Sequence, residues 1–484
     1  MVEQALTPPA LRLPPAIQTA WWLTRPLSLM ARCRARYGDA FSLRFIGFTR
    51  PMTLISDPEA IRALYTEPAH GLPPGRTISL QPVLGERSLL LLEGEEHIAR
   101  RRIMLPPFHG ERMRAYEPLM REIASAEIAR WPIGRAFAVH PRMQALTLEV
   151  ILRAVFGLDE KQTDDRREAQ RAANLRELLR ALLAVSASVR LQLRVLLARR
   201  SPRRDPLAPV LAIRRQIDQL IFAEIADRRK RSDLDQRADI LSLLMLARDE
   251  QGEPLPDSEL RDQLLTLLLA GHETTATALA WTIDLLLHSP PALTRLRGEL
   301  RNAAERPGDE QAQSSAERYL RAVVSEGLRL RPVVPLAGRR LAADLDAGGL
   351  HLPAGSDVSP AIWLVHMRED LYPEATAFRP ERFLASAPST YGWIPFGGGV
   401  RRCLGASFAE MEMRAVLATI FAALELAPAS AKPESPQRRN VTLAPRNGTR
   451  VIVRSRPIGA GDSEHGADRR PCGDSARRSL EGAR

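Results

Sequence analysis

Residues 396–405 of this chain read Phe396-Gly397-Gly398-Gly399-Val400-Arg401-Arg402-Cys403-Leu404-Gly405, and a helical pattern follows directly. Glycine lets a backbone turn tightly and approach a flat ligand closely. A thiol just ahead of a helix meets free N–H groups and the positive end of the helix dipole. With Arg401 and Arg402 beside it, Cys403 is expected to favour the thiolate form. The residues around these glycines do not follow the order of a phosphate-binding loop, so phosphate binding is not indicated. Taken alone, a cysteine in a glycine-rich loop is also compatible with a purely structural role.

The chain that follows this cysteine loop (residues 396–405) is short. A strong helical pattern runs from Leu404 to about Leu426, and a β-like stretch covers Val441 to Val453. From about Pro457 to Arg484 large apolar side chains are almost absent, which predicts a disordered tail. We therefore expect one domain over residues 1–456 and a disordered tail over residues 457–484.

The chain that precedes the loop is mostly helical. Apolar side chains recur three and four residues apart from about Pro58 to Pro332, and prolines divide this pattern into separate helices. Short β segments are expected between Val333 and Pro360, followed by a Gly- and Pro-rich loop from Ala385 to Gly399. The fold class is therefore mainly α, of the α+β type, with a smaller β-rich part.

The N-terminal segment has a different character. Residues 1–35 are proline-rich, and we expect them to pack Trp21 and Trp22 without forming a regular element. Phe41 to Ile46 and Met52 to Ile55 predict a pair of short strands joined by a turn.

Composition excludes several classes of protein. With 484 residues, 45% hydrophobic and 26% charged, the chain is an ordinary globular protein, and three cysteines cannot form a disulfide framework. The net charge of +12 comes from arginines spread along the chain, which argues against nucleic-acid binding and leaves a solvated surface or a basic docking face. Neither a membrane-spanning run nor a signal-peptide pattern is found, so a cytoplasmic protein is expected.

One long helix is predicted from Asp257 to Ser289, where Pro290 ends it. It is apolar almost all round, except for polar side chains at its centre, Ala270-Gly271-His272-Glu273-Thr274-Thr275. Such groups in a core helix need partners or a function. A satisfied buried threonine and a solvent-facing glutamate would be the structural interpretation.

Two more pairs share a helical face. Glu326 and Arg329 are three residues apart, and His97 and Arg101 are four apart. Each pair alone is compatible with an ordinary surface contact. The segment Phe378-Arg379-Pro380-Glu381-Arg382-Phe383 follows about fifty residues after the first pair.

Together these motifs resemble the cytochrome P450 haem-thiolate monooxygenases. The pattern F-x-x-G-x-[RH]-x-C-x-G is met by Phe396, Gly399, Arg401, Cys403 and Gly405, and the other motifs follow in the family's order over about residues 35 to 455. The resemblance implies a cytochrome P450 fold, with a large helical domain, a long central helix over the haem and a small β-rich lobe. It also implies haem b with Cys403 as its axial thiolate ligand and only metal ligand.

The resemblance assigns further residues to the cofactor. His97, Arg101, Arg339 and Arg401 would bind the haem propionates, although Arg100, Arg102 and Arg340 are alternatives that the sequence leaves open. Phe396 and Gly405 would shape the loop under the haem. Ala270 and Gly271 would leave room for dioxygen.

Catalytic and structural roles follow in the same way. Thr274 would hydrogen-bond to the oxygen being activated, and Glu273 would relay protons from solvent. Glu326, Arg329 and Arg382 would form a buried ionic network. The substrate pocket would be aliphatic, lined by Leu267, Thr275, Val334, Leu336 and Leu443.

The expected reaction is hydroxylation of a small apolar substrate, such as a fatty acid or terpenoid, with O₂. About fifty ordered residues after Cys403 cannot form a reductase module, so NAD(P)H would act only indirectly, through an acidic ferredoxin or flavodoxin and its reductase. Val185 to Asp205 would form a lid or a peripheral membrane contact. The alternative is a haem-binding sensor or an electron-independent haem isomerase.

Overall fold

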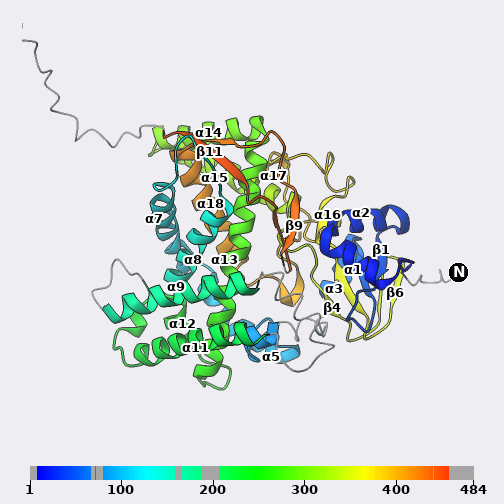
Figure 1. Ribbon diagram of the computed structural model, residues 1–484, viewed down its shortest axis with the longest axis horizontal. Helices are drawn as coiled ribbons and strands as arrows, with labels where there is room; N and C mark the ends of the chain where they lie inside the picture. Colours follow the sequence, from blue (N-terminus) through cyan, green and yellow to red (C-terminus); the bar gives the residue numbers. More distant parts are fainter. Residues whose placement is uncertain are drawn as a thin grey trace, which may run out of the picture.

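The computed structural model describes residues 8–66, 71, 80–158, 166–186, 207–439 and 441–456. Figure 1 shows a large helical part and, to its right, a smaller lobe in which short strands lie beside helices of the N-terminal segment. The predicted mainly α fold with a β-rich lobe is confirmed. The tail 457–484 and most of the segment 185–205 lie outside the described residues.

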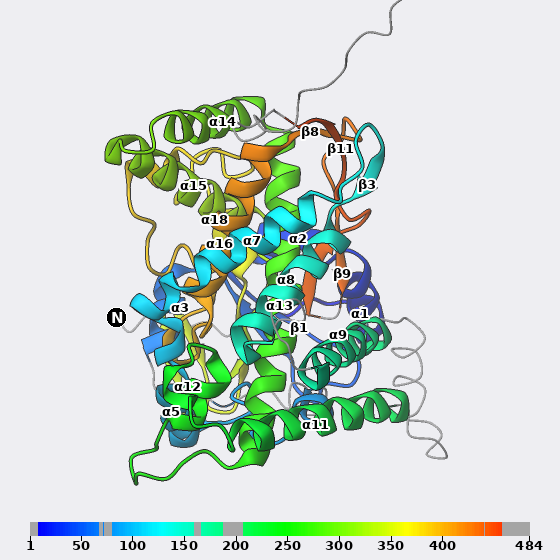
Figure 2. The same cartoon turned by 90° about the vertical axis from the view of Figure 1, so that its left-hand side faces the viewer.

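The long helix α13 (Asp257–Leu287) passes through the centre of the helical part (Figure 2). It ends two residues before its predicted end, and most of its side chains are buried. Its N-cap position is Pro256, and the Asp257 carboxylate in its first turn accepts a hydrogen bond from Arg229 Nε (2.9 Å). Helix α8 (His140–Phe156) is its most extensive neighbour.

Most of the other helices belong to the same helical part as this pair, whereas two short ones, at residues 58–66 and 362–366, pack in the small lobe. The longer ones are α5 (Gly94–Met104), α7 (Tyr116–Ile128), α9 (Arg166–Ser186), α11 (Ala208–Arg228), α14 (Pro290–Glu305), α15 (Glu310–Leu330) and α18 (Ala406–Ala423). The shorter ones are α3 (Pro58–Thr66), α6 (Glu111–Arg114), α12 (Ile240–Leu246), α16 (Ile362–His366), α17 (Arg382–Ala385) and the 3₁₀ turns Pro106–Phe108, Leu234–Gln236 and Gly399–Arg401. Helix α18 is shorter than the predicted 404–426, because the chain continues as a strand after Leu424.

The small lobe is built on a four-stranded sheet of order β1-β2-β7-β4. Its strands are β1 (Ala40–Leu43), β2 (Met52–Ile55), β7 (Asp357–Pro360) and β4 (Arg339–Arg340). The predicted pair β1 and β2 is confirmed as antiparallel, with Phe41 opposite Leu54. The segment 333–360 also forms the predicted short strands, including the hairpin of β5 (Leu345–Ala347) and β6 (Leu350–Leu352).

Two small sheets pack against the helical part, where strands of both contact α13. One has the order β3-β11-β8 and the other pairs β10 with β9. Their strands are β3 (Ala136–Ala138), β8 (Glu425–Pro428), β9 (Pro436–Arg439), β10 (Thr442–Pro445) and β11 (Arg450–Ser455). The β-like stretch predicted from Val441 to Val453 corresponds to β10 and β11, whereas β3, β8 and β9 are not predicted, because strands of three or four residues lack a clear alternating pattern.

The prediction for the N-terminal segment is wrong. It forms two helices, α1 (Pro15–Thr24) and α2 (Pro26–Tyr37), each beginning on a proline. Proline has no N–H to donate, and the first helical position needs none, so these prolines start helices instead of excluding them. Trp21 and Trp22 pack as expected, against the core of the small lobe.

Candidate active site

Cys403 lies between the 3₁₀ turn Gly399–Arg401 and helix α18. Its N–H donates to the carbonyl oxygen of Phe396 (2.9 Å), which closes the loop, and the N–H of Gly405 donates to its sulfur. The Cys403 side chain is exposed, whereas the first turns of α18 are largely buried. The loop therefore presents the sulfur to a ligand.

The expectation that Cys403 favours the thiolate needs correction. The sulfur is accessible but lies deep among protein atoms. This desolvation raises the pKa of the thiol more than the Gly405 N–H, Arg101 and Arg402 lower it. The helix dipole and two arginines do not suffice to ionise this thiol. A metal ion at the sulfur would displace the proton, because a coordinating thiol is deprotonated.

The glycines of the loop pack against Tyr65 of α3. A Cβ at Gly398 would lie 2.3 Å from the Tyr65 ring, and a Cβ at Gly399 (φ +63°) would lie 2.5 Å from its backbone oxygen. The sequence analysis assigns these glycines to close approach of a flat ligand. At Gly398 and Gly399, however, the space left by the missing side chain is filled by Tyr65 and not by a flat ligand.

Four basic side chains were predicted to hold the cofactor. Arg101, in the last turn of α5, is half-buried and interacts electrostatically with Cys403. His97, one turn earlier, is buried. Arg401 donates to the carbonyl oxygen of Leu92, just before α5. Arg339 on β4 is 5% exposed, and burial lowers its pKa.

The three alternative arginines are each bound to a carboxylate of the chain itself. Arg100 pairs with Glu259 of α13, and Arg102 pairs with Glu250. Arg340 donates to both oxygens of Asp357 (2.8 and 2.9 Å). These pairs favour Arg101 and Arg339, which have no carboxylate partner among the described residues.

In the central segment of α13, Ala270 borders open space and Gly271 faces α8. Ala270 is exposed although most of the helix is buried, so the helix borders open space there. Thr274, one turn later, is half-buried and donates to the carbonyl oxygen of Ala270 (2.6 Å). A Cβ at Gly271 would lie 3.0 Å from Cδ1 of Ile151 on α8. The missing side chain of Gly271 therefore lets α8 approach, and the role of Gly271 in making room for dioxygen stays a prediction.

Glu273 is directed towards α8. Its Oε2 accepts a hydrogen bond from Nε2 of Gln144 (2.5 Å), and its Oε1 lies 3.8 Å from Nε2 of His140. Burial raises the pKa of Glu273, whereas burial lowers the pKa of His140 to about 4. The sequence analysis does not identify Gln144 and His140, because nothing in their local pattern indicates which helix faces Glu273.

The five predicted pocket residues divide into two groups. Leu267, Val334 and Leu336 are half-buried, as expected for residues that border a cavity. Thr275 and Leu443 are each 4% exposed. Thr275 donates to the carbonyl oxygen of Gly271, and Leu443 pairs through its backbone with Val333. Both belong to the packed interior, which corrects their assignment.

Glu326 and Arg329 of α15 meet Arg382, the first residue of α17. Glu326 binds Arg329 through both oxygens (2.6 and 2.8 Å) and also accepts from Nε of Arg382 (3.1 Å). Glu326 and Arg329 are fully buried. Arg329 donates further to the carbonyl oxygens of His366 and Ala375 (2.7 and 2.8 Å). The bonds to His366, Ala375 and Arg382 anchor the chain that leads into the cysteine loop.

His366 is a second anchor of that chain. Its Nδ1 lies 3.0 Å from the carbonyl oxygen of Arg329, and its Nε2 lies 3.0 Å from the N–H of Ile394. Since Nε2 can only accept from an N–H, the proton is on Nδ1. Burial, with a contribution from the Arg329 charge, lowers the pKa of His366 from 6.5 to about 3.

This shift predicts acid sensitivity. The unfolded chain binds a proton at His366 near pH 6.5 and the folded chain near pH 3, so the free energy of unfolding falls as the pH drops between these values. The free energy of unfolding changes through this group by at most about 1.4 kcal/mol per pH unit. We measure the free energy of unfolding by urea denaturation at pH 7 and at pH 5. At pH 7 we expect it to be lower in His366→Gln than in the wild type, and between pH 7 and 5 we expect it to fall less in the variant. Parallel profiles would contradict this, and His109→Gln is the control, because His109 is exposed.

The geometry around Cys403 and Arg339 fits a haem. A buried cation is stable only with a compensating anion, and the described hydrogen-bond acceptors of Arg339 are two neighbouring carbonyl oxygens. A propionate is such an anion. The exposed thiol of Cys403 and the exposed Ala270 supply an iron ligand and open space on α13. A cysteine sulfur as iron ligand and a buried arginine for a propionate are the groups that a haem with a thiolate ligand needs.

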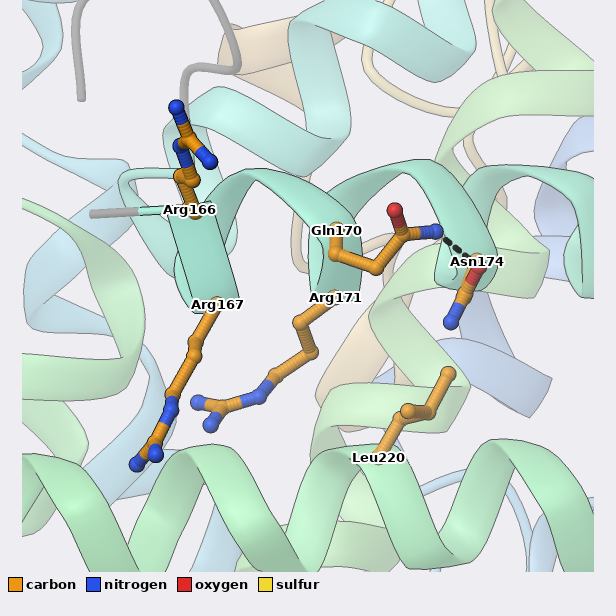
Figure 3. A pocket seen from close by; sticks show the side chains of 6 residues that line it. All are labelled: Arg166, Arg167, Gln170, Arg171, Asn174 and Leu220. Carbon is orange, nitrogen blue, oxygen red and sulfur yellow. Dashed lines mark hydrogen bonds between the residues drawn. The ribbon is translucent and has the colours of Figure 1, made fainter. Parts of the chain in front are cut away.

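A basic recess lies elsewhere, between α9 and α11 (Figure 3). It has a volume of about 360 Å³ and is lined by Arg166, Arg167, Gln170, Arg171, Asn174 and Leu220. It contains none of the predicted site residues. Arg171 is already paired with Glu224 and Asp227 of α11, so the recess offers less free positive charge than its composition suggests.

Comparison with known proteins agrees with the site. A sequence profile of the family described as Cytochrome P450 matches residues 8–452. Cytochrome P450 135B1 of Mycobacterium tuberculosis is 40% identical over 93% of this chain and 91% of its own length. Cytochrome P450 137 of the same organism is 37% identical over 88% of this chain and 85% of its own length.

Among solved structures, retinoic acid-bound cyanobacterial CYP120A1 superposes with a TM-score of 0.78. It is 25% identical, and the match covers 93% of this chain and 99% of that one. Within the described residues, no helix is both long and apolar enough to cross a membrane. On its cysteine loop, its fold and the match to nearly its whole length, this chain belongs to the cytochrome P450 family.

Proposed function

We propose that this haem-dependent monooxygenase hydroxylates a small apolar substrate, of the fatty-acid or terpenoid kind, with electrons from an acidic ferredoxin or flavodoxin. Monooxygenase activity, haem and axial thiolate ligation follow from membership of the family. The substrate class rests on one observation: Leu267, Val334 and Leu336, which are half-buried, and the exposed Ala270 are all aliphatic. The retinoic acid bound to the solved relative is consistent with a largely apolar ligand.

The substrate class is tested by adding fatty acids, terpenoids and polar analogues of similar size to the purified protein. Displacement of water from a haem iron changes its spin state and its absorption spectrum. We expect apolar compounds to cause this change and to be oxygenated in a reaction that needs both a reductant and O₂. Spectral response and turnover only with charged compounds would contradict the proposal.

The haem, when bound, supplies the iron at which dioxygen is activated. The protein has to hold the substrate, exclude water and deliver protons. Glu273 suits proton delivery because burial raises its pKa, so the carboxyl group holds a proton nearer neutral pH than an exposed glutamate does. Thr274 carries the adjacent hydroxyl on the face of α13 that includes Ala270.

Replacing Thr274 by alanine is expected to uncouple the reaction. Without this hydroxyl, proton delivery is slower, and more reducing equivalents leave as hydrogen peroxide. We expect the ratio of product to NAD(P)H consumed to fall several-fold, measured with product and peroxide assays in a reconstituted system. Thr275→Ala is the matched control, because Thr275 makes the same type of bond to the carbonyl four residues earlier but is buried. Equal coupling in both variants would remove Thr274 from the mechanism.

The electron donor is proposed from charge. Arg402, next to Cys403, is exposed, and the chain carries a net charge of +12. A basic surface attracts an acidic partner at a rate that falls with ionic strength. We expect reduction by an acidic ferredoxin or flavodoxin to slow as salt is added, and to slow at low salt in Arg402→Glu. Such donors and their NAD(P)H-dependent reductases are cytoplasmic, which is the compartment this proposal implies.

A further inference from the structure

Tyr65 in the last turn of α3 lies along the cysteine loop. A Cβ at Gly399 would contact its backbone oxygen, and a Cβ at Gly398 would overlap its ring. At Gly397, a Cβ would lie 3.9 Å from the Tyr65 hydroxyl. The side chain therefore runs along the loop towards Phe396, and its hydroxyl lies at the Phe396 end.

The Tyr65 hydroxyl is buried and has no hydrogen-bond partner in the described part of the chain. The residue is 6% exposed, and its oxygen makes no hydrogen bond to any of the described residues. A buried hydroxyl that lacks a partner costs free energy, and buried polar groups in native proteins are nearly always bonded. Burial raises the pKa of Tyr65 to about 12, so the phenol keeps its proton at neutral pH and is available as a donor.

Arg339 is the neighbouring donor. Its guanidinium carbon lies 6.0 Å from the centre of the Tyr65 ring. It donates to the carbonyl oxygens of Gly338 (2.9 Å) and Ala337 (3.5 Å) and has no carboxylate partner among the residues that the structure describes. A buried cation and a buried phenol, neither of which has an anionic acceptor within the described ranges, are thus brought together beside the cysteine loop.

We propose that the Tyr65 hydroxyl donates a hydrogen bond to the haem propionate that Arg339 binds. Tyr65 is then a further cofactor-binding residue, fixed in position by Gly398 and Gly399. This inference rests on the assignment of Arg339 to a propionate. It explains why the loop has no side chain where the Tyr65 ring lies: any Cβ at Gly398 would displace the ring and with it the hydroxyl.

The test compares the haem-loaded wild type with Tyr65→Phe, which keeps the ring against the glycines and removes only the hydroxyl. Haem release is followed by transfer to excess apomyoglobin. We expect release to be about tenfold faster in the variant, equivalent to about 1.4 kcal/mol. Tyr116→Phe is the matched control, because Tyr116 is also buried but donates to the carbonyl oxygen of Ala238 (2.9 Å). It should lower stability and leave haem release unchanged.

A second measurement identifies the acceptor. Wild type and Tyr65→Phe are reconstituted with haem analogues in which one or the other propionate is replaced by methyl. The difference in release rate should persist with one analogue and vanish with the other. Equal release rates with natural haem, or a difference that persists with both analogues, would overturn the proposal. Neither measurement needs substrate, reductant or turnover, so a failure of the proposed substrate or electron donor leaves the result interpretable.

Discussion

Replacing Cys403 by alanine is expected to abolish monooxygenase turnover, by roughly a thousandfold or more, the scale set by loss of an essential catalytic group. The sulfur is the side-chain atom that the loop presents, with the Gly405 N–H bonded to it and Arg101 nearby. Without it the iron has no thiolate ligand, and the absorption spectrum of the reduced, carbon monoxide-bound protein should lose its thiolate character. Turnover and this spectrum are the measurements.

The control for this variant is Cys33→Ala. Cys33 is buried in α2, and burial raises the pKa of its thiol to about 11, so it is neither exposed nor ionised. We expect this variant to keep both spectrum and turnover. A thiolate-type spectrum retained in Cys403→Ala would contradict the assignment of the iron ligand.

The second large effect is expected from Glu326→Ala. Removal of this carboxylate leaves Arg329, which is fully buried, without its counter-charge, and also frees Arg382 and the N–H of Arg379. Breaking a buried ion pair by deleting one partner costs about 3–5 kcal/mol. The free energy of unfolding, measured by urea denaturation, should fall by about this amount. Loss of soluble, haem-binding protein would be the extreme form of the same result.

Glu317→Ala is the control on the same helix. Glu317 pairs with Arg414 (2.8 Å) and Arg321 (3.6 Å), but its side chain is 44% exposed. Solvent screens such pairs, and we expect a loss of about 1 kcal/mol or less. Equal losses for the two variants would mean that Glu326 acts as an ordinary surface charge.

The arginines proposed to bind the cofactor show what the sequence could not decide. Arg100, Arg101 and Arg102 are consecutive, and no local pattern separates them. Successive positions on a helix point about 100° apart, so only the tertiary neighbours decide their partners. In the structure, Arg102 pairs with Glu250 and Arg100 pairs with Glu259. Arg101 interacts electrostatically with Cys403. Arg339 and Arg340 are separated in the same way, by Asp357 on β7.

Tyr65 was missed for the same reason. It precedes the cysteine loop by more than three hundred residues, and its position in α3 resembles that of any buried aromatic side chain. Its relation to the glycines appears only when α3 packs against the loop. The N-terminal helices escape prediction for a local reason: prolines start helices as well as prevent them, and the proline-rich composition of residues 1–35 does not show which effect holds.

Short-range pattern and spacing alone determined the long apolar helix, the helical majority of the chain and the cysteine loop, and hence the family. These features are local, because apolar periodicity and a ten-residue motif can be recognised without knowledge of their tertiary contacts. Tertiary structure alone decided the protonation of Cys403, the direction of Glu273, the interior position of Thr275 and Leu443, and the partners of each arginine. Desolvation and ion pairing depend on atoms brought together from distant parts of the chain, and no stretch of sequence contains that information.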